Sequence, residues 1–315
     1  MKSLDAIARN SQDDGRWSPS ATAPAKRAAQ AVAVATRRLP GRRRMLPAVL
    51  IVGAQRSGTT SMYRALSWHP AVLKAVLHKG VHYFDMHPER SLGWYRAHFP
   101  AAAAGRRVER SLGIAPLTFE SSPYYMFHPL VPERIAGALP GVKLLVLVRD
   151  PVERAYSAHA HESARGYESE TFERALELED DRLRGEAERL VAEPGYRSHS
   201  HQHHAYRRRG QYVEQLEVLE RNFGRDRVHV VDSGSFFSEP EAAYAGVLDF
   251  LGLPQLGFPP FEQNNARRRA SMPESLREKM NDHFQPFDER LTEWLGAEPS
   301  WRRLPSGGAS SVSPT

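Results

Sequence analysis

The sequence predicts an α/β fold in which a central, mainly parallel sheet is flanked by helices. Four short apolar runs, rich in β-branched residues and bounded by glycine, proline or charged residues, have the pattern of buried strands. They are "PAVLIVGA" (47–54), "HPAVLKAV" (69–76), "GVKLLVLVRDP" (141–151) and "RVHVVDSGSF" (227–236). Helical patterns separate these runs, and strands that alternate with helices form parallel sheets covered on both faces.

The helices are predicted from apolar periodicity and from the residues at their ends. Over 59–68, three apolar side chains share one helical face: Met62, Ala65 and Leu66. Over 151–165, a proline occupies the first turn, where its missing N–H is harmless. The amphipathic segment 211–224 ends at a glycine suited to a C-cap, and 239–254 ends with the run "GLP".

Charge is distributed unevenly along the chain. The formal net charge is +6, but residues 1–45 alone carry +7, from ten Lys/Arg and three Asp/Glu, and the remainder carries −1. We therefore predict a basic, disordered arm over 1–45, one domain over 46–298 and a flexible tail over 299–315. The run "RRLPGRRR" (37–44) could contact nucleic acid, but a solvated arm is the preferred interpretation.

Composition excludes or disfavours several classes of protein. The chain has no cysteine, which excludes disulfides and cysteine nucleophiles and fits a reducing compartment. No apolar run approaches the roughly 20 residues that span a bilayer, and the N-terminus lacks a signal-peptide pattern. We expect a cytoplasmic protein without a membrane span, and leave its oligomeric state open.

The run "GAQRSGTT" (53–60) indicates a phosphate-binding loop between a strand and a helix. It matches G-x-x-x-x-G, but Thr59 stands where nucleoside triphosphatases have a lysine. Consecutive backbone N–H groups and a helix N-terminus still make an anion site, and Arg56 supplies a cation from within the loop. The pattern favours an anion other than a triphosphate clamped by Mg²⁺; a glycine turn that binds nothing is the alternative.

A second anion site is predicted where the strand in 141–151 ends. Arg149 closes the strand and Ser157 lies two turns into the next helix, so the two can converge on a phosphate, with the arginine as a bidentate fork. Asp150 could be mistaken for the metal-binding aspartate of a triphosphatase. Since Asp150 precedes a proline, we prefer to interpret it as the start of a helix.

At these residues the chain resembles the sulfotransferases that use 3′-phosphoadenosine 5′-phosphosulfate (PAPS), especially the branch of heparan sulfate sulfotransferases and their bacterial relatives. The matching motifs occur in family order over roughly 47–295. They are "GAQRSGTTSMYRAL" (53–66), "KGVHYFD" (79–85), "ESSPYYMFHP" (120–129), "VLVRDPVERAYSAH" (146–159), "RGQYVEQLEVLERNFG" (209–224) and "VLDFLGLP" (247–254). The resemblance implies a P-loop-containing sulfotransferase fold related to nucleotide kinases.

The resemblance also implies which residues bind the co-substrate, with no metal required. Arg56 takes the place of the loop lysine that the family uses on the sulfuryl group. The residues implied for the 5′-phosphosulfate are Ser57, Gly58, Thr59 and Thr60, and those for the 3′-phosphate are Arg149 and Ser157. A loop that folds over the co-substrate corresponds to "NNARRRASM" (264–272), where an exposed basic run is the alternative; its candidates are Arg267, Arg268 and Arg269.

The general base is where the sequence departs from the family. In the heparan sulfate branch a catalytic glutamate stands at the position of Gly80, and a lysine stands at that of Ser121. His82 is retained and titrates near neutral pH, so it is the first candidate base. Lys79 and Glu120 are nearby alternatives. A structural histidine and a structural or capping glutamate are the competing interpretations.

Two further segments admit more than one interpretation. In "YRSHSHQHHAYRRRG" (196–210), His201 and His204 have a spacing seen in metal ligands, but a solvated or acceptor-facing loop is preferred. Its arginines, Arg207 to Arg209, could meet an anionic acceptor. Three aromatic residues could line an acceptor cleft, but we assign them to the core: Tyr124, Tyr125 and Phe127.

The sequence thus predicts a PAPS-dependent sulfotransferase that acts on a hydroxyl, or an amine, of a carbohydrate, glycolipid or small-metabolite acceptor. In-line displacement at sulfur needs a base at the acceptor and cations or N–H donors at the sulfuryl oxygens. A P-loop nucleotide kinase is one alternative, disfavoured by the missing lysine. A non-catalytic nucleotide- or polyanion-binding protein is the other, suggested by the basic arm and the two lost catalytic groups.

Overall fold

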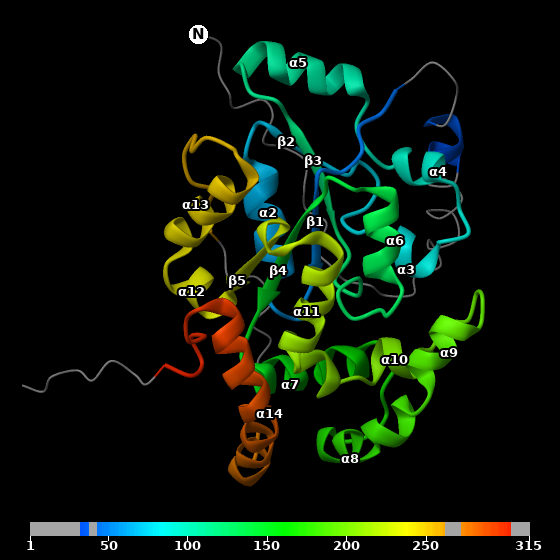
Figure 1. Cartoon of the computed structure of the whole chain (residues 1–315), viewed down its shortest axis with the longest axis vertical. Coiled ribbons are helices and arrows are strands. Elements are labelled where there is room, and N and C mark those ends of the chain that lie inside the picture. Colours follow the sequence, from blue (N-terminus) through cyan, green and yellow to red (C-terminus); the bar gives the residue numbers. More distant parts are fainter. Residues whose placement is uncertain (1–31, 38–42, 262–271, 304–315) are drawn as a thin grey trace, which may run out of the picture.

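The computed structural model describes residues 32–37, 43–261 and 272–303, which form a five-stranded sheet flanked by helices (Figure 1). Every strand pair is parallel, and the strand order is β2-β3-β1-β4-β5. The strands are β1 (Val49–Gly53), β2 (Val72–Lys74), β3 (Leu117–Ser121), β4 (Lys143–Val148) and β5 (Val228–Asp232). The predicted α/β class with a mainly parallel sheet is therefore confirmed.

The helices connect these strands and extend beyond them. The first group is α2 (Thr59–Trp68), α3 (Tyr83–Met86), α4 (Leu92–Arg96), α5 (Ala102–Leu112), α6 (Val131–Ala138) and α7 (Pro151–Ala164). The second is α8 (Phe172–Leu183), α9 (Glu186–Ala192), α10 (His199–His203), α11 (Tyr212–Phe223), α12 (Ser233–Ser238), α13 (Pro240–Leu251) and α14 (Glu274–Leu295). Short 3-10 turns are η2 (Arg208–Gly210) and η3 (Arg225–Arg227).

Both faces of the sheet are buried, as a parallel sheet requires. In β1, Leu50 and Val52 point to one face and Val49 and Ile51 to the other, following the two-residue period of a strand. The first face packs against α6 and α11, and the second against α2, α12 and α13. Figure 1 shows α12 and α13 on one side of the sheet and α6 on the other.

A third apolar cluster forms away from the sheet. It joins the buried faces of α7, α8 and α14, and includes Val152, Leu176 and Phe284. Figure 1 shows α7, α8, α9 and α10 gathered at one end of the molecule. These helices place α7 and α10 against the functional cavity described below.

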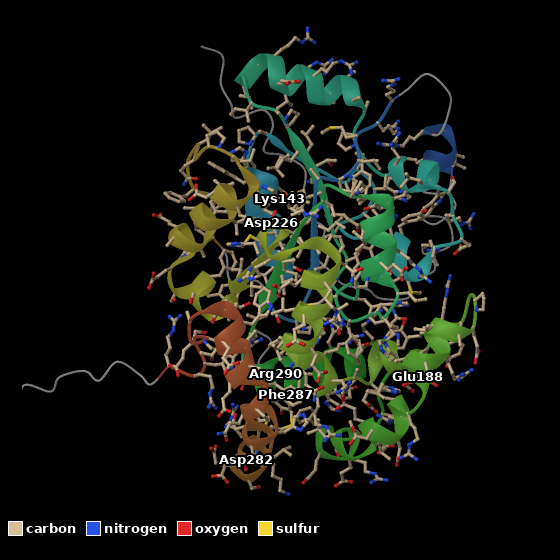
Figure 2. The ribbon with its side chains drawn as sticks, in the orientation of Figure 1. Lys143, Glu188, Asp226, Asp282, Phe287 and Arg290 are labelled. Carbon is tan, nitrogen blue, oxygen red and sulfur yellow. The ribbon has the colours of Figure 1, made fainter. Side chains whose placement is uncertain are left out.

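Helix α14 was not predicted from the sequence. It runs for 22 residues with Pro286 inside it, and a proline normally argues against a helix interior. Tertiary contacts hold it: Phe287 packs on the first core cluster, and Arg290 lies 2.6 Å from Glu217 of α11. Figure 2 labels Phe287 and Arg290 along this helix.

Described residues of the predicted arm and of the predicted tail contact the domain. In the predicted arm, Arg37 donates to the carbonyl groups of Ala97 and Phe99 at 2.9 and 3.0 Å. In the predicted tail, the Ser300 amide donates to the Asp232 carboxylate at 2.6 Å. Parts of both segments are therefore bound to the folded body. No helix among the described residues is long and apolar enough to cross a membrane.

Candidate active site

A cavity of about 660 Å³ lies at the carboxyl ends of the strands. Its walls include residues that directly follow β1, β3, β4 and β5, among them Arg56, Tyr124, Arg149 and Ser233. Ligands of open α/β sheets bind at this edge, because the connecting loops there can splay apart around them. The remaining walls come from the start of α2, the segment that carries Lys79 and His82, α7, α10, η2 and the segment 300–301.

The predicted phosphate-binding loop lines this cavity. Gly58, at φ 85°, is the N-cap of α2, and Arg56 also has a positive φ of 71°. The first turn of α2 has neither a capping side chain nor an acidic residue. Since Gly58, Thr59 and Thr60 line the cavity, the positive end of the helix dipole faces it, as an anion site requires.

The two predicted anion sites adjoin one another. Arg56 donates from Nε to the Oγ of Ser157 on α7 at 3.1 Å, so the loop and the helix meet inside the cavity. Arg149 lines the same cavity, and its guanidinium lies 3.7 Å from Glu153. Asp150 accepts from the backbone of Val152 and Glu153 at 2.9 and 3.3 Å. It is the N-cap of α7, as the preferred interpretation held.

Lys79 brings a second cation to the start of α2. Its Nζ donates to Thr60 Oγ1 at 2.8 Å, and the side chain lines the cavity. Burial, together with the positive charges of Arg64 and Arg56, lowers the pKa of Lys79 to about 8. The amine is therefore mostly charged at pH 7 and loses its charge as the pH rises through about 8.

His82 faces the cavity as part of a hydrogen-bonded pair. Its Nδ1 lies 2.7 Å from the carboxylate of Asp85, which is fully buried, while the imidazole is 40 % exposed. Burial lowers the pKa of His82, but the charge and hydrogen bond of Asp85 raise it by more, so the pKa lies above its ordinary value. An imidazole oriented in this way is the usual form of a histidine base.

Glu120 does not reach the cavity. It is fully buried, and its carboxylate accepts from the Val81 amide, Ser122 Oγ and the hydroxyls of Tyr95 and Tyr125 at 2.6 to 3.0 Å. Burial raises its pKa, against the effect of these hydrogen bonds. All four donors come from within the core, so the geometry speaks against Glu120 as the base.

The same network fixes the backbone that carries His82. Val81 N–H binds Glu120 directly, and His82 N–H binds Ser122 Oγ at 3.1 Å. Tyr125 Oη, itself bound to Glu120, accepts from Tyr83 N–H at 2.8 Å. His82 is held in the left-handed region at φ 52°, which is costly for a residue other than glycine and depends on such support.

Gly80 lies against strand β3 with no room for a side chain. A Cβ at this position would lie 2.4 Å from the carbonyl oxygen of Ser121. The position that carries a glutamate in the resembling branch is therefore closed here by the backbone. The local packing therefore requires glycine at position 80, and a glutamate could not be placed there without moving the backbone.

The other predicted residues have mixed outcomes. Ser57 is fully buried outside the cavity lining, its amide donates to the Ala54 carbonyl at 3.2 Å, and its carbonyl accepts from Ser233. Tyr124 lines the cavity although it is buried, whereas Tyr125 belongs to the core as assigned. The candidates Arg267, Arg268 and Arg269 lie outside the described residues.

The histidine-rich segment contains the short helix α10, and only some of its residues face the cavity. His201 is buried beside Tyr124, whose hydroxyl lies 2.8 Å from its Nδ1, and His204 bonds the Tyr167 carbonyl at 2.8 Å. Neither lines the cavity. His203, which the i,i+3 spacing passed over, does line it, together with Arg209. Spacing alone could not tell which histidine of a short helix faces the cavity.

Several lining residues were missed by the sequence analysis. Gln55, Arg165, Phe237 and Trp301 all lie in the cavity wall. Trp301 is held by a hydrogen bond from its indole N–H to Asp288 at 2.9 Å. The signal that could have found Gln55 was its place in the phosphate loop. Trp301 lies in the segment predicted to be a tail, and no local pattern marked it.

Positive charge dominates the cavity. Five lining residues carry cationic side chains: Arg56, Lys79, Arg149, Arg165 and Arg209. The acidic member of the lining is Asp150, which is occupied at the start of α7. A cavity with this donor set attracts a ligand that carries several negative charges.

Comparison with known proteins agrees with this geometry. The profile of the family described as "Sulfotransferase domain" matches residues 46–287 of the chain. The human protein heparan sulfate glucosamine 3-O-sulfotransferase 6 is 26% identical over 294 residues, which cover 83% of this chain and 75% of the relative. The membrane-associated sulfotransferase kil1 of Dictyostelium discoideum is 23% identical, and the match covers 82% and 67% of the two chains.

A solved structure shares the fold of this chain. It is the crystal structure of a sulfotransferase from Alicyclobacillus acidocaldarius, with a TM-score of 0.62 and 28% sequence identity. The similarity covers 82% of this chain and 100% of that one.

Proposed function

The chain belongs to the sulfotransferase domain family, and from that premise we propose that it transfers a sulfuryl group from PAPS to a hydroxyl, or an amine, of a carbohydrate, glycolipid or small metabolite. The observation that carries the proposal is the convergence of Arg56, Ser157 and Arg149 in one cationic cavity. The loop lacks the lysine of a triphosphatase, and its cation comes from Arg56 instead.

The residues present fit a phosphosulfate nucleotide. The dipole of α2 and the N–H groups of its first turn face the cavity without a protein acid to neutralise them. Gly58, Thr59, Thr60 and Arg56 would hold the 5′-phosphosulfate, and Arg149 with Ser157 the 3′-phosphate. PAPS supplies an activated sulfuryl group whose leaving group is a phosphate.

The protein then has two tasks in the reaction. His82, oriented by Asp85, removes the proton from the acceptor hydroxyl as its oxygen attacks sulfur, and its raised pKa suits it to hold that proton. Arg56 and Lys79 neutralise the negative charge on the sulfuryl oxygens and the leaving phosphate. Glu120 has a structural role, because it binds the Val81 amide and the Ser122 hydroxyl and so fixes the backbone of His82.

The two alternatives lose their support. Membership of the sulfotransferase family removes the reason to consider a nucleotide kinase. A non-catalytic protein was suggested by the missing glutamate and lysine. The buried Asp85 and the network that holds His82 in a costly conformation favour a catalytic role over binding alone.

The proposal is tested by transfer of labelled sulfate from PAPS. Amino sugar glycans such as heparan sulfate are the first acceptors to screen, because the human relative is described as a heparan sulfate glucosamine 3-O-sulfotransferase; glycolipids and simple glycosides follow. We expect labelled product with at least one acceptor class and slow release of sulfate to water without one. Complete absence of both, in a protein that is folded, would refute the proposal.

A further inference from the structure

We infer that His203 and Glu162 form an acceptor-binding pair, in which His203 accepts a hydrogen bond from a second hydroxyl of the acceptor while the first hydroxyl reacts at His82. The inference rests on the proposed function and deepens it, because it favours a polyhydroxylated acceptor. The two histidines come from different elements, with His203 at the end of α10 and His82 before α3.

The first observation is the orientation of the imidazole. His203 Nδ1 lies 2.9 Å from Glu162 Oε2, and the side chain of Glu162 is only 1% exposed. Burial raises the pKa of Glu162, but the hydrogen bond from His203 and nearby positive groups lower it by more, so the pKa lies below its ordinary value. An ionised carboxylate accepts hydrogen bonds only, so Nδ1 carries the hydrogen.

The second observation concerns the other nitrogen of His203. The ring stacks on Tyr167, with centroids 4.2 Å apart and planes 30° apart, which limits its rotation. Within the part of the chain that the structure describes, Nε2 makes no hydrogen bond, and the side chain lines the cavity at 10% exposure. In a neutral ring with Nδ1–H, Nε2 presents a lone pair that a hydroxyl can donate to.

The third observation ties the pair to the reacting end of the cavity. Gln55, which directly precedes Arg56, donates to the second oxygen of Glu162 at 3.0 Å. Glu162 lies five residues beyond Ser157 on α7, or about 7.5 Å further along the helix at its usual rise. The pair therefore lies beyond the predicted 3′-phosphate site and beside the loop that faces the sulfuryl group.

The fourth observation joins α10 to the support of His82. The Tyr124 hydroxyl lies 2.8 Å from His201 of α10, and Tyr124 lines the cavity. Tyr124 stands two residues after Ser122, which holds the His82 amide. One turn thus links the wall that carries His82 to the wall that carries His203, and both side chains line the same cavity.

Imidazole NMR on ¹⁵N-labelled protein tests the pair without knowledge of the natural acceptor. The probe is a methyl glucoside at about 50 mM, enough to occupy most of a site with a millimolar dissociation constant. We expect Nε2 of His203 to shift on addition of the glucoside and not on addition of 3′-phosphoadenosine 5′-phosphate (PAP) alone. In Glu162→Gln, the glucoside-induced shift should fall at least threefold.

Turnover gives the second readout, with the acceptor class that the labelled-sulfate screen favours. His203→Gln should raise KM for the acceptor about tenfold and leave kcat within about threefold. The PAP dissociation constant should not change. This pattern is expected because the lost hydrogen bond stabilises the bound acceptor equally in the ground state and in the transition state. The matched control is His159→Gln on α7, whose Nε2 bonds the Glu170 carbonyl at 2.9 Å outside the cavity lining.

Three results would overturn the inference. The first is that the glucoside does not shift the Nε2 signal of His203. The second is that PAP alone shifts this signal as much as the glucoside does. The third is that His203→Gln lowers kcat and abolishes the pH dependence of kcat. If the unsubstituted protein does not bind PAP, the proposed function fails. In that case the glucoside titration of His203, carried out without PAP, still tests the acceptor-binding pair.

Discussion

Arg56 Nε and Ser157 Oγ lie 3.1 Å apart, which places a residue of the phosphate loop in direct contact with a residue of α7. The contact joins the two proposed anion sites, whose segments are about a hundred residues apart in the chain. Arg149, at the end of β4, lines the same cavity.

Removal of Arg149 should weaken binding of nucleotides that carry a 3′-phosphate. A hydrogen bond to a charged group contributes about 1.5–3 kcal/mol, so Arg149→Ala should raise the PAP dissociation constant by roughly 10- to 150-fold. Binding of adenosine 5′-phosphosulfate, which lacks the 3′-phosphate, should change little. Calorimetry measures both, and Arg174→Ala, an exposed arginine paired with Glu177, is the control. Equal losses for both nucleotides would refute the assignment.

The affinity for PAP should depend on the charge of Lys79. Its pKa is about 8 because burial and two neighbouring arginines disfavour the charged amine. Near pH 7 the amine is mostly charged, and the affinity for PAP should fall as the pH rises through about 8 to 9. The phosphate groups have ionised by then, since their second pKa is about 6. In Lys79→Met the affinity should be lower and flat over this range; an unchanged pH dependence would contradict the role of Lys79.

The pH dependence of turnover should report His82. Its pKa is raised by Asp85, so kcat/KM should rise with pH as the imidazole loses its proton above its ordinary range. Asp85→Asn removes the charge that raises this pKa and should move the rise to lower pH. His82→Ala should lower kcat by about 100-fold or more and abolish the rise. Full turnover in His82→Ala would show that another group is the base.

Gly80 should tolerate no side chain. A Cβ would lie 2.4 Å from the Ser121 carbonyl, and overpacking of this kind costs about 1–3 kcal/mol. Urea unfolding of Gly80→Ala should show that loss, while Gly141→Ala, where a Cβ meets no atom within 4 Å, should be close to neutral. Gly80→Glu should not improve turnover. A Gly80→Glu variant that is stable and more active would mean that the glutamate position is open after all.

Local pattern was sufficient for most of the sheet but not for all of it. The runs that became β1 and β4 are almost continuously apolar, and the runs that became β2 and β5 are apolar enough that they too could be identified. Strand β3 escaped notice because Leu117–Ser121 contains a threonine and a glutamate, which look unsuited to a buried strand. The partners that make burial of Glu120 acceptable come from distant segments, and no local pattern reveals them.

The sequence likewise allowed some residues of the candidate site to be predicted and not others. The loop 53–60 and the pair Arg149 and Ser157 could be found because strand ends and helix starts have recognisable residues. His203, Arg165 and Trp301 could not, because their places in the cavity depend on how α7, α10 and the segment after α14 pack. Glu120 was proposed as a base from its neighbourhood in sequence, and burial gives it a structural part instead.

Calorimetric titration with PAP, set against ATP with Mg²⁺, tests the central claim most directly. We expect one PAP bound per chain, tight binding without any metal, and at least tenfold weaker binding of ATP with Mg²⁺. Arg56→Ala should weaken PAP binding, and Arg56→Lys should restore much of it, because a lysine preserves the loop cation. No binding of PAP to the folded protein, or tighter binding of ATP with Mg²⁺, would contradict the claim.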